Sequence, residues 1–133
     1  MRAVTATKLV VIVLAGLIAS SGGGQAFEKK PFDMAAFKAA QSAGKPIVVD
    51  VFAPWCPVCI AQQKVLGTLA QNPKYDKLTL FKVDFDNQPD VLKSFKVRQQ
   101  STLIAFKGET ETARSAGDTQ AASIEALFDT TLN

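Results

Sequence analysis

The hydrophobic pattern of the chain changes repeatedly between two periods. Short runs of β-branched and aromatic residues, bounded by glycine, proline or polar clusters, predict buried strands, and a polar run after Gly108 predicts a strand at a sheet edge. Longer segments with apolar residues three and four positions apart predict helices, the first of them capped by Asp33 and ended at Gly44. The expected strands are 47–52, 78–84, 102–106 and 110–116, and the expected helices are 34–43, 57–71, 89–95 and 119–132.

The order of these elements predicts an α/β fold. Helices and strands alternate until two final strands, which the turn Lys107-Gly108-Glu109 joins into a hairpin. Such an order is typical of a mixed central sheet with helices on both faces. The connection between strands 47–52 and 78–84 is long enough for a right-handed βαβ unit. We therefore expect a single domain.

The N-terminal residues have the pattern of a secretory signal peptide. Arg2 and Lys8 precede an apolar stretch at 9–19, and Gly24 and Ala26 stand at the −3 and −1 positions of a cleavage site. The apolar stretch is shorter than the roughly 20 residues that span a bilayer. We predict cleavage after Ala26 and export, with a periplasmic location. The alternative is an uncleaved N-terminal anchor that faces the periplasm.

Residues 1–26 are thus assigned to the signal peptide and 27–133 to the domain. The whole chain carries 15 basic and 12 acidic residues, for a net charge of +3. Removal of Arg2 and Lys8 with the signal would leave 13 basic residues and a net charge of +1. That balance gives no indication of nucleic-acid or membrane-surface binding.

The two cysteines are the most informative residues of the chain. Cys56 and Cys59 form a CxxC motif between the strand 47–52 and the helix 57–71. A structural zinc site needs four ligands, and the chain has no histidine. A structural disulfide closing so small a loop would contribute only about 2 kcal/mol. A copper relay would favour thioether ligands, which are scarce here. In this strand–turn–helix context the motif indicates reversible thiol–disulfide exchange.

The helix start also predicts different roles for the two thiols. Unpaired backbone N–H groups and the helix dipole favour the thiolate there, and the thiolate is the nucleophile. We expect Cys56 to be exposed and reactive, and Cys59, one turn further, to be shielded and to resolve the mixed disulfide. Pro57 suits an early helix position, where its missing N–H costs nothing.

Several spaced segments resemble the thioredoxin-fold family, in particular its exported thiol–disulfide oxidoreductases. The resemblance covers nearly all of the chain after the signal. It rests on 49–56, 82–86, 97–98, 102–107 and Gly117. It implies a thioredoxin-like domain that exchanges disulfides with protein or peptide substrates and needs no cofactor or metal.

The resemblance also implies roles for individual residues. Cys56 matches the attacking cysteine and Cys59 the resolving one. Asp50 matches a buried acid that accepts the proton of Cys59, Lys82 a basic partner of that acid, and Trp55 an aromatic flank of the substrate surface. The plainer alternatives are a solvated strand-end acid for Asp50, a surface lysine for Lys82 and a core aromatic for Trp55.

The chain departs from the family pattern at two places. The family has a cis-proline before the third strand, where this chain has Ser101, and the pair between the cysteines, Pro57-Val58, also differs from the cytosolic members. A cis bond before serine costs about 2.5–4 kcal/mol, so we predict a trans Gln100–Ser101 bond. The loop is then strained or reshaped, and the sulfurs gain a hydroxyl in place of an apolar lid. Pro57, Gln100, Ser101 and Thr102 join Trp55 as expected substrate-binding residues.

Two other classes of function stay open. A peptide-binding or chaperone-like module could carry the cysteines incidentally, and Ser101 leaves room for a metal or iron–sulfur carrier that uses Cys56 and Cys59. The domain is too short for the inserted helical domain of dedicated periplasmic oxidases, which favours the reductase direction. A reductase in this compartment would need a membrane electron donor. We expect a monomer.

Overall fold

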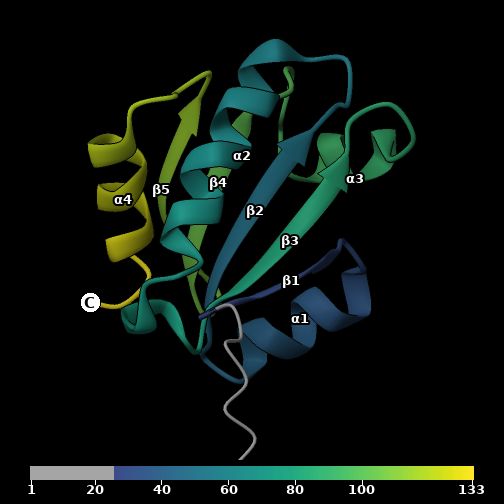
Figure 1. Ribbon diagram of the computed structural model, residues 1–133. Coiled ribbons are helices and arrows are strands. Elements are labelled where there is room, and N and C mark those ends of the chain that lie inside the picture. The colour runs from purple at the N-terminus through teal and green to yellow at the C-terminus, as the bar shows by residue number, and fades with distance from the viewer. Residues whose placement is uncertain (1–25) are drawn as a thin grey trace, which may run out of the picture.

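The computed structural model describes residues 26–133 (Figure 1). The elements are, in chain order, β1 (Glu28–Pro31), α1 (Met34–Ser42), β2 (Pro46–Phe52), α2 (Pro57–Leu69), the 3-10 helix η1 (Pro73–Tyr75), β3 (Thr79–Asp84), α3 (Pro89–Ser94), β4 (Thr102–Lys107), β5 (Thr110–Ala116) and α4 (Ala121–Asp129). All eight elements predicted from the sequence are present, with ends that differ by a few residues. The predicted signal peptide lies outside the described residues, apart from Ala26. In the part of the chain described, no helix is long and apolar enough to cross a membrane.

The sheet is mixed, as predicted. Its five strands have the order β1-β3-β2-β4-β5. β1 and β2 run parallel to β3, whereas β4 is antiparallel to β2 and to β5. The parallel strands β2 and β3 are joined through α2, which is the expected βαβ unit.

The sequence analysis missed β1 and was wrong to begin the fold with a helix. The strand Glu28–Pro31 is short and polar, carries two lysines and ends in proline. These are features of an edge strand that is protected against pairing with another chain, and they lack the alternation by which strands are recognised. Only pairing with β3 reveals it, because the Phe32 N–H donates to the Lys82 carbonyl at 2.8 Å.

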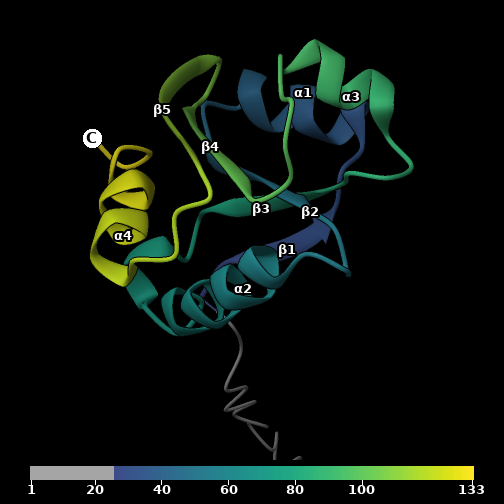
Figure 2. The same cartoon turned by 90° about the horizontal axis from the view of Figure 1, so that it is seen from above.

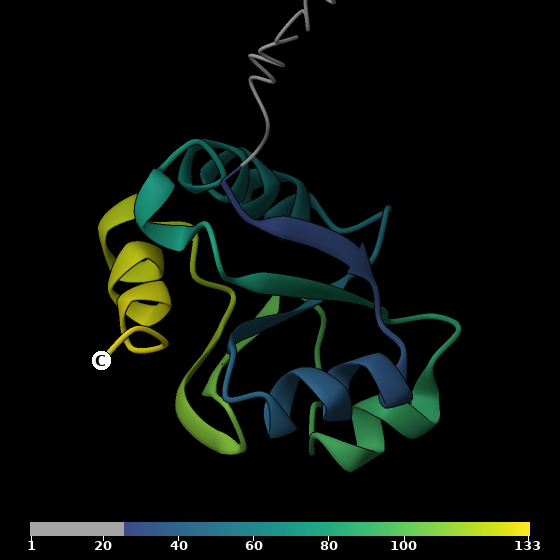
Figure 3. The same cartoon turned by 90° about the horizontal axis from the view of Figure 1, so that it is seen from below.

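Helices cover both faces of the sheet, which confirms the predicted layers. α1 and α3 lie on one face and α2 and α4 on the other (Figures 2 and 3). The core under α1 and α3 is rich in phenylalanine, with ring centroids 5.3–6.1 Å apart. The core under α2 and α4 contains aliphatic residues together with Phe27, Tyr75 and Phe128. Each face of the sheet therefore has its own packed core, and the loops at the ends of the strands extend from this packed framework.

The predicted ends of α1 are confirmed. The Asp33 carboxylate accepts the Ala36 N–H at 2.8 Å, which satisfies one of the free donors at the start of the helix. Gly44 follows the helix with φ +68°, a conformation that glycine adopts without strain. The turn then directs the chain into β2, the strand that leads to the cysteines.

Candidate active site

The cysteine pair lies where β2 ends and α2 begins, near the top of the view in Figure 1. Cys56 is the N-cap of α2, and its Sγ accepts the Cys59 N–H at 3.1 Å. Pro57 occupies the first turn, where no donor is lost, and its side chain is exposed. Both cysteines are free, so the structure represents the dithiol state.

Cys56 is not exposed, contrary to the prediction. Only 2% of the residue is accessible, because its sulfur turns toward the helix and packs with Ala53 and Cys59, beside the half-buried Phe85. Burial opposes ionisation, but hydrogen bonds from Cys59 and from the side chain of Gln100 outweigh it and bring the pKa of Cys56 below its ordinary value. The thiolate of Cys56 is therefore stabilised although it is covered.

Cys59 is fully buried, as predicted. Its Sγ lies 4.0 Å from the Val51 carbonyl oxygen, inside the apolar cluster. Burial, and then the neighbouring Cys56, raise the pKa of Cys59 to about 11. The two thiols thus differ in ionisation, and Cys56 is the one that loses its proton first.

Asp50 is the buried acid expected from the resemblance. It lies in the middle of β2 on the face covered by α2 and is fully buried. Its Oδ2 accepts a hydrogen bond from Gln63 Nε2 at 2.9 Å, while Oδ1 has no partner among the described residues. Burial raises the pKa of Asp50, and Gln63, Lys82 and Lys29 act in the opposite direction. A carboxyl with a raised pKa and a free oxygen can accept or donate a proton in a buried site.

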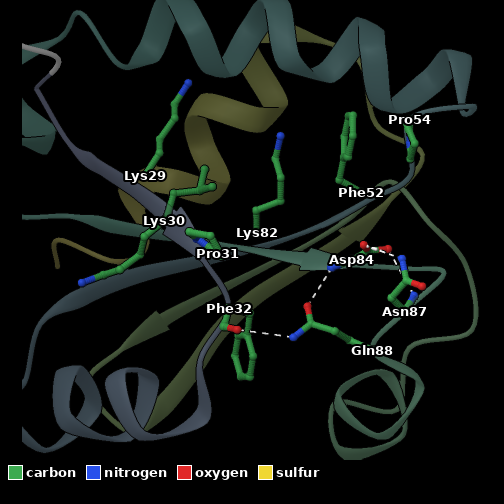
Figure 4. Close-up of a pocket in the computed structure, with 11 residues that line it drawn as sticks. Lys29, Lys30, Pro31, Phe32, Phe52, Pro54, Lys82, Asp84, Asn87 and Gln88 are labelled. Carbon is green, nitrogen blue, oxygen red and sulfur yellow. Dashed lines mark hydrogen bonds between the residues drawn. The ribbon is translucent and has the colours of Figure 1, made fainter.

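Lys82 lies beside Asp50, also as expected. The two residues are register partners in β3 and β2, so their side chains leave the sheet on the same face. The Lys82 ammonium sits 4.0 Å from the centre of the Phe52 ring. Lys82, Phe52 and Lys29 extend into a groove of about 670 Å³ at the sheet edge, toward the side of α2, whereas Lys30 points away (Figure 4). Lys29 escaped the sequence analysis because it belongs to the unpredicted strand β1.

Trp55 lies on the surface and is not a core aromatic. It is 57% exposed, and its indole N–H donates to an Asp86 carboxylate oxygen at 2.9 Å. Phe85 packs edge-on against the indole with the ring centres 6.3 Å apart. The exposed side chains of Val58 and Ile60 follow on α2. These three exposed apolar side chains lie close to the cysteines in sequence, with Val58 and Ile60 on different sides of α2.

The loop at Ser101 is reshaped, and the predicted trans bond is confirmed. No cis peptide occurs within residues 26–133, and Ser101 takes φ +56°, in the left-handed region. Its N–H donates to the Val51 carbonyl at 2.8 Å, and its carbonyl accepts the Gly117 N–H at 2.9 Å and Gln62 Nε2 at 3.0 Å. The Ser101 hydroxyl donates to the Gln100 carbonyl at 2.6 Å, so it is engaged with the backbone.

The expected substrate-binding residues of this loop differ in accessibility. Ser101 and Thr102 are buried, and the Thr102 hydroxyl donates to the Gln99 carbonyl at 2.8 Å. Gln100 is half-buried and reaches Cys56. Contact of these residues with a substrate stays a prediction, and the geometry favours Gln100 over its two neighbours.

Besides Lys29, the sequence analysis missed two residues of the site, Gln62 and Gln63. Gln63 binds the buried acid, and Gln62 binds the loop at Ser101. A signal for Gln62 exists in the sequence, because it lies on the buried stripe of α2, which is Cys59, Gln62, Leu66 and Leu69. A polar residue on such a stripe needs a hydrogen-bond partner, but helical periodicity cannot say which one.

The geometry also bears on the alternative of a metal site. Across residues 26–133, no group of three or more cysteine, aspartate or glutamate side chains is arranged to hold a metal ion. Cys56 and Cys59 are adjacent to each other and to backbone groups. Their arrangement suits a bond between the two sulfurs.

Comparisons with known proteins agree with this geometry. The sequence model of the family described as thioredoxin matches residues 28–130. Thioredoxin of Mycobacterium bovis is 36% identical over 93 residues, which cover 69% of this chain and 79% of that protein. The bifunctional thioredoxin reductase/thioredoxin of Mycobacterium leprae is 33% identical over 85 residues, 64% of this chain and only 18% of that protein.

A solved structure gives the same result. The crystal structure of Trxlp from Edwardsiella tarda has 42% sequence identity and a TM-score of 0.74, and the match covers 76% of this chain and 98% of that one. Because the family match extends over well more than half of the chain, this protein belongs to the thioredoxin family of thiol–disulfide oxidoreductases.

Proposed function

We propose that this protein is an exported reductase of protein disulfides, in which Cys56 attacks and Cys59 resolves. The observation that carries the proposal is the asymmetry of the pair. The pKa of Cys56 is lowered and that of Cys59 is raised to about 11. Because only the thiolate attacks a disulfide, the first bond to a substrate forms at Cys56.

The exchange then balances in two steps. The Cys56 thiolate attacks one sulfur of the substrate disulfide and forms a mixed disulfide, and the first substrate thiolate leaves. Cys59 loses its proton and attacks the Cys56 sulfur, which releases the second substrate thiolate and leaves a Cys56–Cys59 disulfide. Two electrons pass from the dithiol to the substrate, and an external dithiol must return them.

Asp50 is the proposed acceptor for the proton of Cys59. Its burial, its raised pKa and its free oxygen Oδ1 support this role. Lys82 and Lys29 favour the ionised carboxylate, so they keep Asp50 able to act as a base. The proposal assigns Lys82 to the electrostatics of the site and no direct contact with the substrate.

The substrate is proposed to be a protein or peptide that contacts the exposed apolar side chains next to the cysteines, which are Trp55, Val58 and Ile60. Their exposure beside the cysteines supports this, because a small polar disulfide would gain little from it. Residues 1–26 are proposed to direct export to the periplasm, where a membrane electron donor would recharge the monomeric protein.

Reduction of insulin by the purified protein, with dithiothreitol as electron donor, tests the activity. We expect turnover in the parent, none in Cys56→Ser, and a trapped mixed disulfide in Cys59→Ser. A parent protein that binds insulin without reducing it would instead indicate a peptide-binding module. Metal bound by anaerobically purified protein, and lost on Cys56→Ser, would favour the carrier alternative.

The location needs a separate experiment. Fusion of residues 1–30 to alkaline phosphatase, which is active only after export, should give phosphatase activity and a shortened fusion. An active fusion of full length would indicate an uncleaved anchor. An inactive fusion would contradict export.

A further inference from the structure

Gln62 is an unusual residue for its place in the core. It is fully buried on the stripe of α2 that also carries Cys59. Its Nε2 donates to the Ser101 carbonyl at 3.0 Å and to the Asp118 carbonyl at 2.7 Å. One amide therefore joins three segments: α2, the turn that precedes β4 and the turn that follows β5. The start of β4 and the end of β5 are paired neighbours in the sheet (Figure 1).

This arrangement is not what packing alone would select. The Oε1 atom of Gln62 is buried and has no partner among residues 26–133. A buried polar atom without a hydrogen bond costs about 1–3 kcal/mol, and leucine or methionine would fill the same space without that cost. What the amide provides in exchange for this cost is its pair of hydrogen bonds to the two turns.

The turn held by Gln62 needs support. Ser101 has φ +56°, where a non-glycine residue is strained by about 1–2 kcal/mol. Three hydrogen bonds to backbone groups of Ser101 oppose this strain, and the one from Gln62 is the only one of them that comes from a side chain. The same turn sets the position of Gln100, which reaches Cys56.

We infer that Gln62 is a positioning residue for disulfide exchange: it holds the Ser101 turn in its left-handed conformation and so fixes the backbone against which a substrate segment lies beside the cysteines. The inference rests on the proposed reduction of protein disulfides, because only a docked segment would sense the turn. The hydrogen bonds of Gln62 go to the two turns and not to either sulfur. Its effect on the reaction passes through Ser101 and Gln100.

The test is Gln62→Met, which keeps the length of the side chain and removes both donors. We expect a rise of about tenfold in KM for insulin, the loss that about 1.4 kcal/mol of docking energy would produce, with kcat nearly unchanged. Reduction of a small aromatic disulfide, which needs no docked segment, should keep its rate. Gln71→Met is the matched control, since it makes the same change at an exposed site just beyond α2.

Rescue separates positioning from a merely structural role. Glycine adopts positive φ without strain. Adding Ser101→Gly to Gln62→Met should therefore lower the KM for insulin most of the way back to the parent value. An unchanged KM for Gln62→Met, an equal loss with the small disulfide, or a loss that Ser101→Gly leaves in place would each overturn the inference. Should Gln62→Met fail to fold, Gln62→Glu replaces the amide with a carboxyl that can supply at most one of the two hydrogen bonds, and the inference then requires a raised KM for insulin that Ser101→Gly lowers again.

A structural measurement keeps the inference independent of the proposed function. The coupling between the amide and α protons of Ser101 reports its φ. It should move toward the value of an extended residue in Gln62→Met and stay unchanged in Gln71→Met. If the parent protein fails to reduce insulin, the proposed function fails, and the coupling still decides whether Gln62 holds the turn. An unchanged coupling in Gln62→Met refutes the positioning.

Discussion

The hydrogen bond between Gln63 and Asp50 allows a quantitative prediction. Gln63 Nε2 lies 2.9 Å from Asp50 Oδ2 and is the only hydrogen-bond donor to this fully buried carboxyl among the described residues. The substitution Gln63→Met removes the donor and keeps a side chain of similar length. Because a hydrogen bond to a charged group contributes about 1.5–3 kcal/mol, the ionised form of Asp50 should lose that amount of stabilisation.

The effect should depend on pH in a defined direction. Burial raises the pKa of Asp50, so the folded protein holds the proton more tightly than the unfolded chain, in which the pKa is about 3.9. The contribution of Asp50 to stability is therefore greatest at low pH and falls as the pH rises from that value to the higher folded pKa. Gln63→Met should raise the pKa of Asp50 in the folded protein further, so the loss of stability with rising pH should continue to a higher pH.

Urea unfolding from pH 3 to pH 8 measures the prediction. We expect Gln63→Met to lose about 1.5–3 kcal/mol at pH 8 and clearly less at pH 3, where the carboxyl is neutral and a hydrogen bond to it contributes only about 1 kcal/mol. Carbon NMR of the Asp50 carboxyl should show its pKa moving up. Gln71→Met serves as the control, and it should match the parent at every pH.

Two results would refute the reasoning. An equal loss of stability at pH 3 and pH 8 would mean that Gln63 contributes by packing and not by binding the carboxylate. A pKa of Asp50 that stays in place or falls would show that the hydrogen bond does not favour the ionised form.

Three further predictions concern the same site. Asp50→Asn should stabilise the protein at pH 8 by at least about 1 kcal/mol in urea unfolding, because it removes a buried charge. It should also slow the decay of the mixed disulfide by about 10²-fold, and an unchanged decay rate would exclude Asp50 from the resolving step. Limiting iodoacetamide at pH 8 should label Cys56 first, because only roughly one in a thousand Cys59 thiols is ionised at that pH with a pKa of about 11. Peptide mapping that found the label mainly on Cys59 would reverse the two roles. Ser101→Pro should destabilise the domain by about 3 kcal/mol or more in the same unfolding assay, because proline requires a negative φ and cannot donate to the Val51 carbonyl; a loss below about 1 kcal/mol would show that the loop accepts another shape.

Much of this molecule follows from local sequence. The apolar periods predicted the four α-helices and three of the five strands, because those elements bury one face or both against a core, and the hairpin turn at Gly108 predicted β5. The short 3-10 helix η1 was not predicted. The spacing of Cys56 and Cys59 at a helix start indicated exchange chemistry, since the helix geometry around a cap depends on neighbouring residues alone. Resemblance to a family then supplied the burial of Asp50 and its neighbour Lys82, and the structure places both as expected.

What the sequence left open depends on segments that are far apart in the chain. β1 is a strand only because β3 offers it a pairing edge, and its polar residues carry no signal of their own. Cys56 packs beside Phe85 and accepts a hydrogen bond from the side chain of Gln100, both distant in the chain, so its place at a helix start could not reveal that it is buried.

The same reason applies to the residues that surround the cysteines. A glutamine on the buried face of α2 is compatible with several partners, and its neighbours in sequence do not choose among them. Only the packed fold brings Gln63 to Asp50 and Gln62 to the turns at Ser101 and Asp118. Likewise, the missing proline predicted a trans bond at Ser101, but its left-handed conformation depends on backbone hydrogen bonds with Val51, Gly117 and Gln62, which lie far from it in the chain. Local patterns thus determined the elements and the chemistry, whereas the contacts that tune that chemistry exist only in the tertiary structure, because they join groups that the chain itself keeps apart.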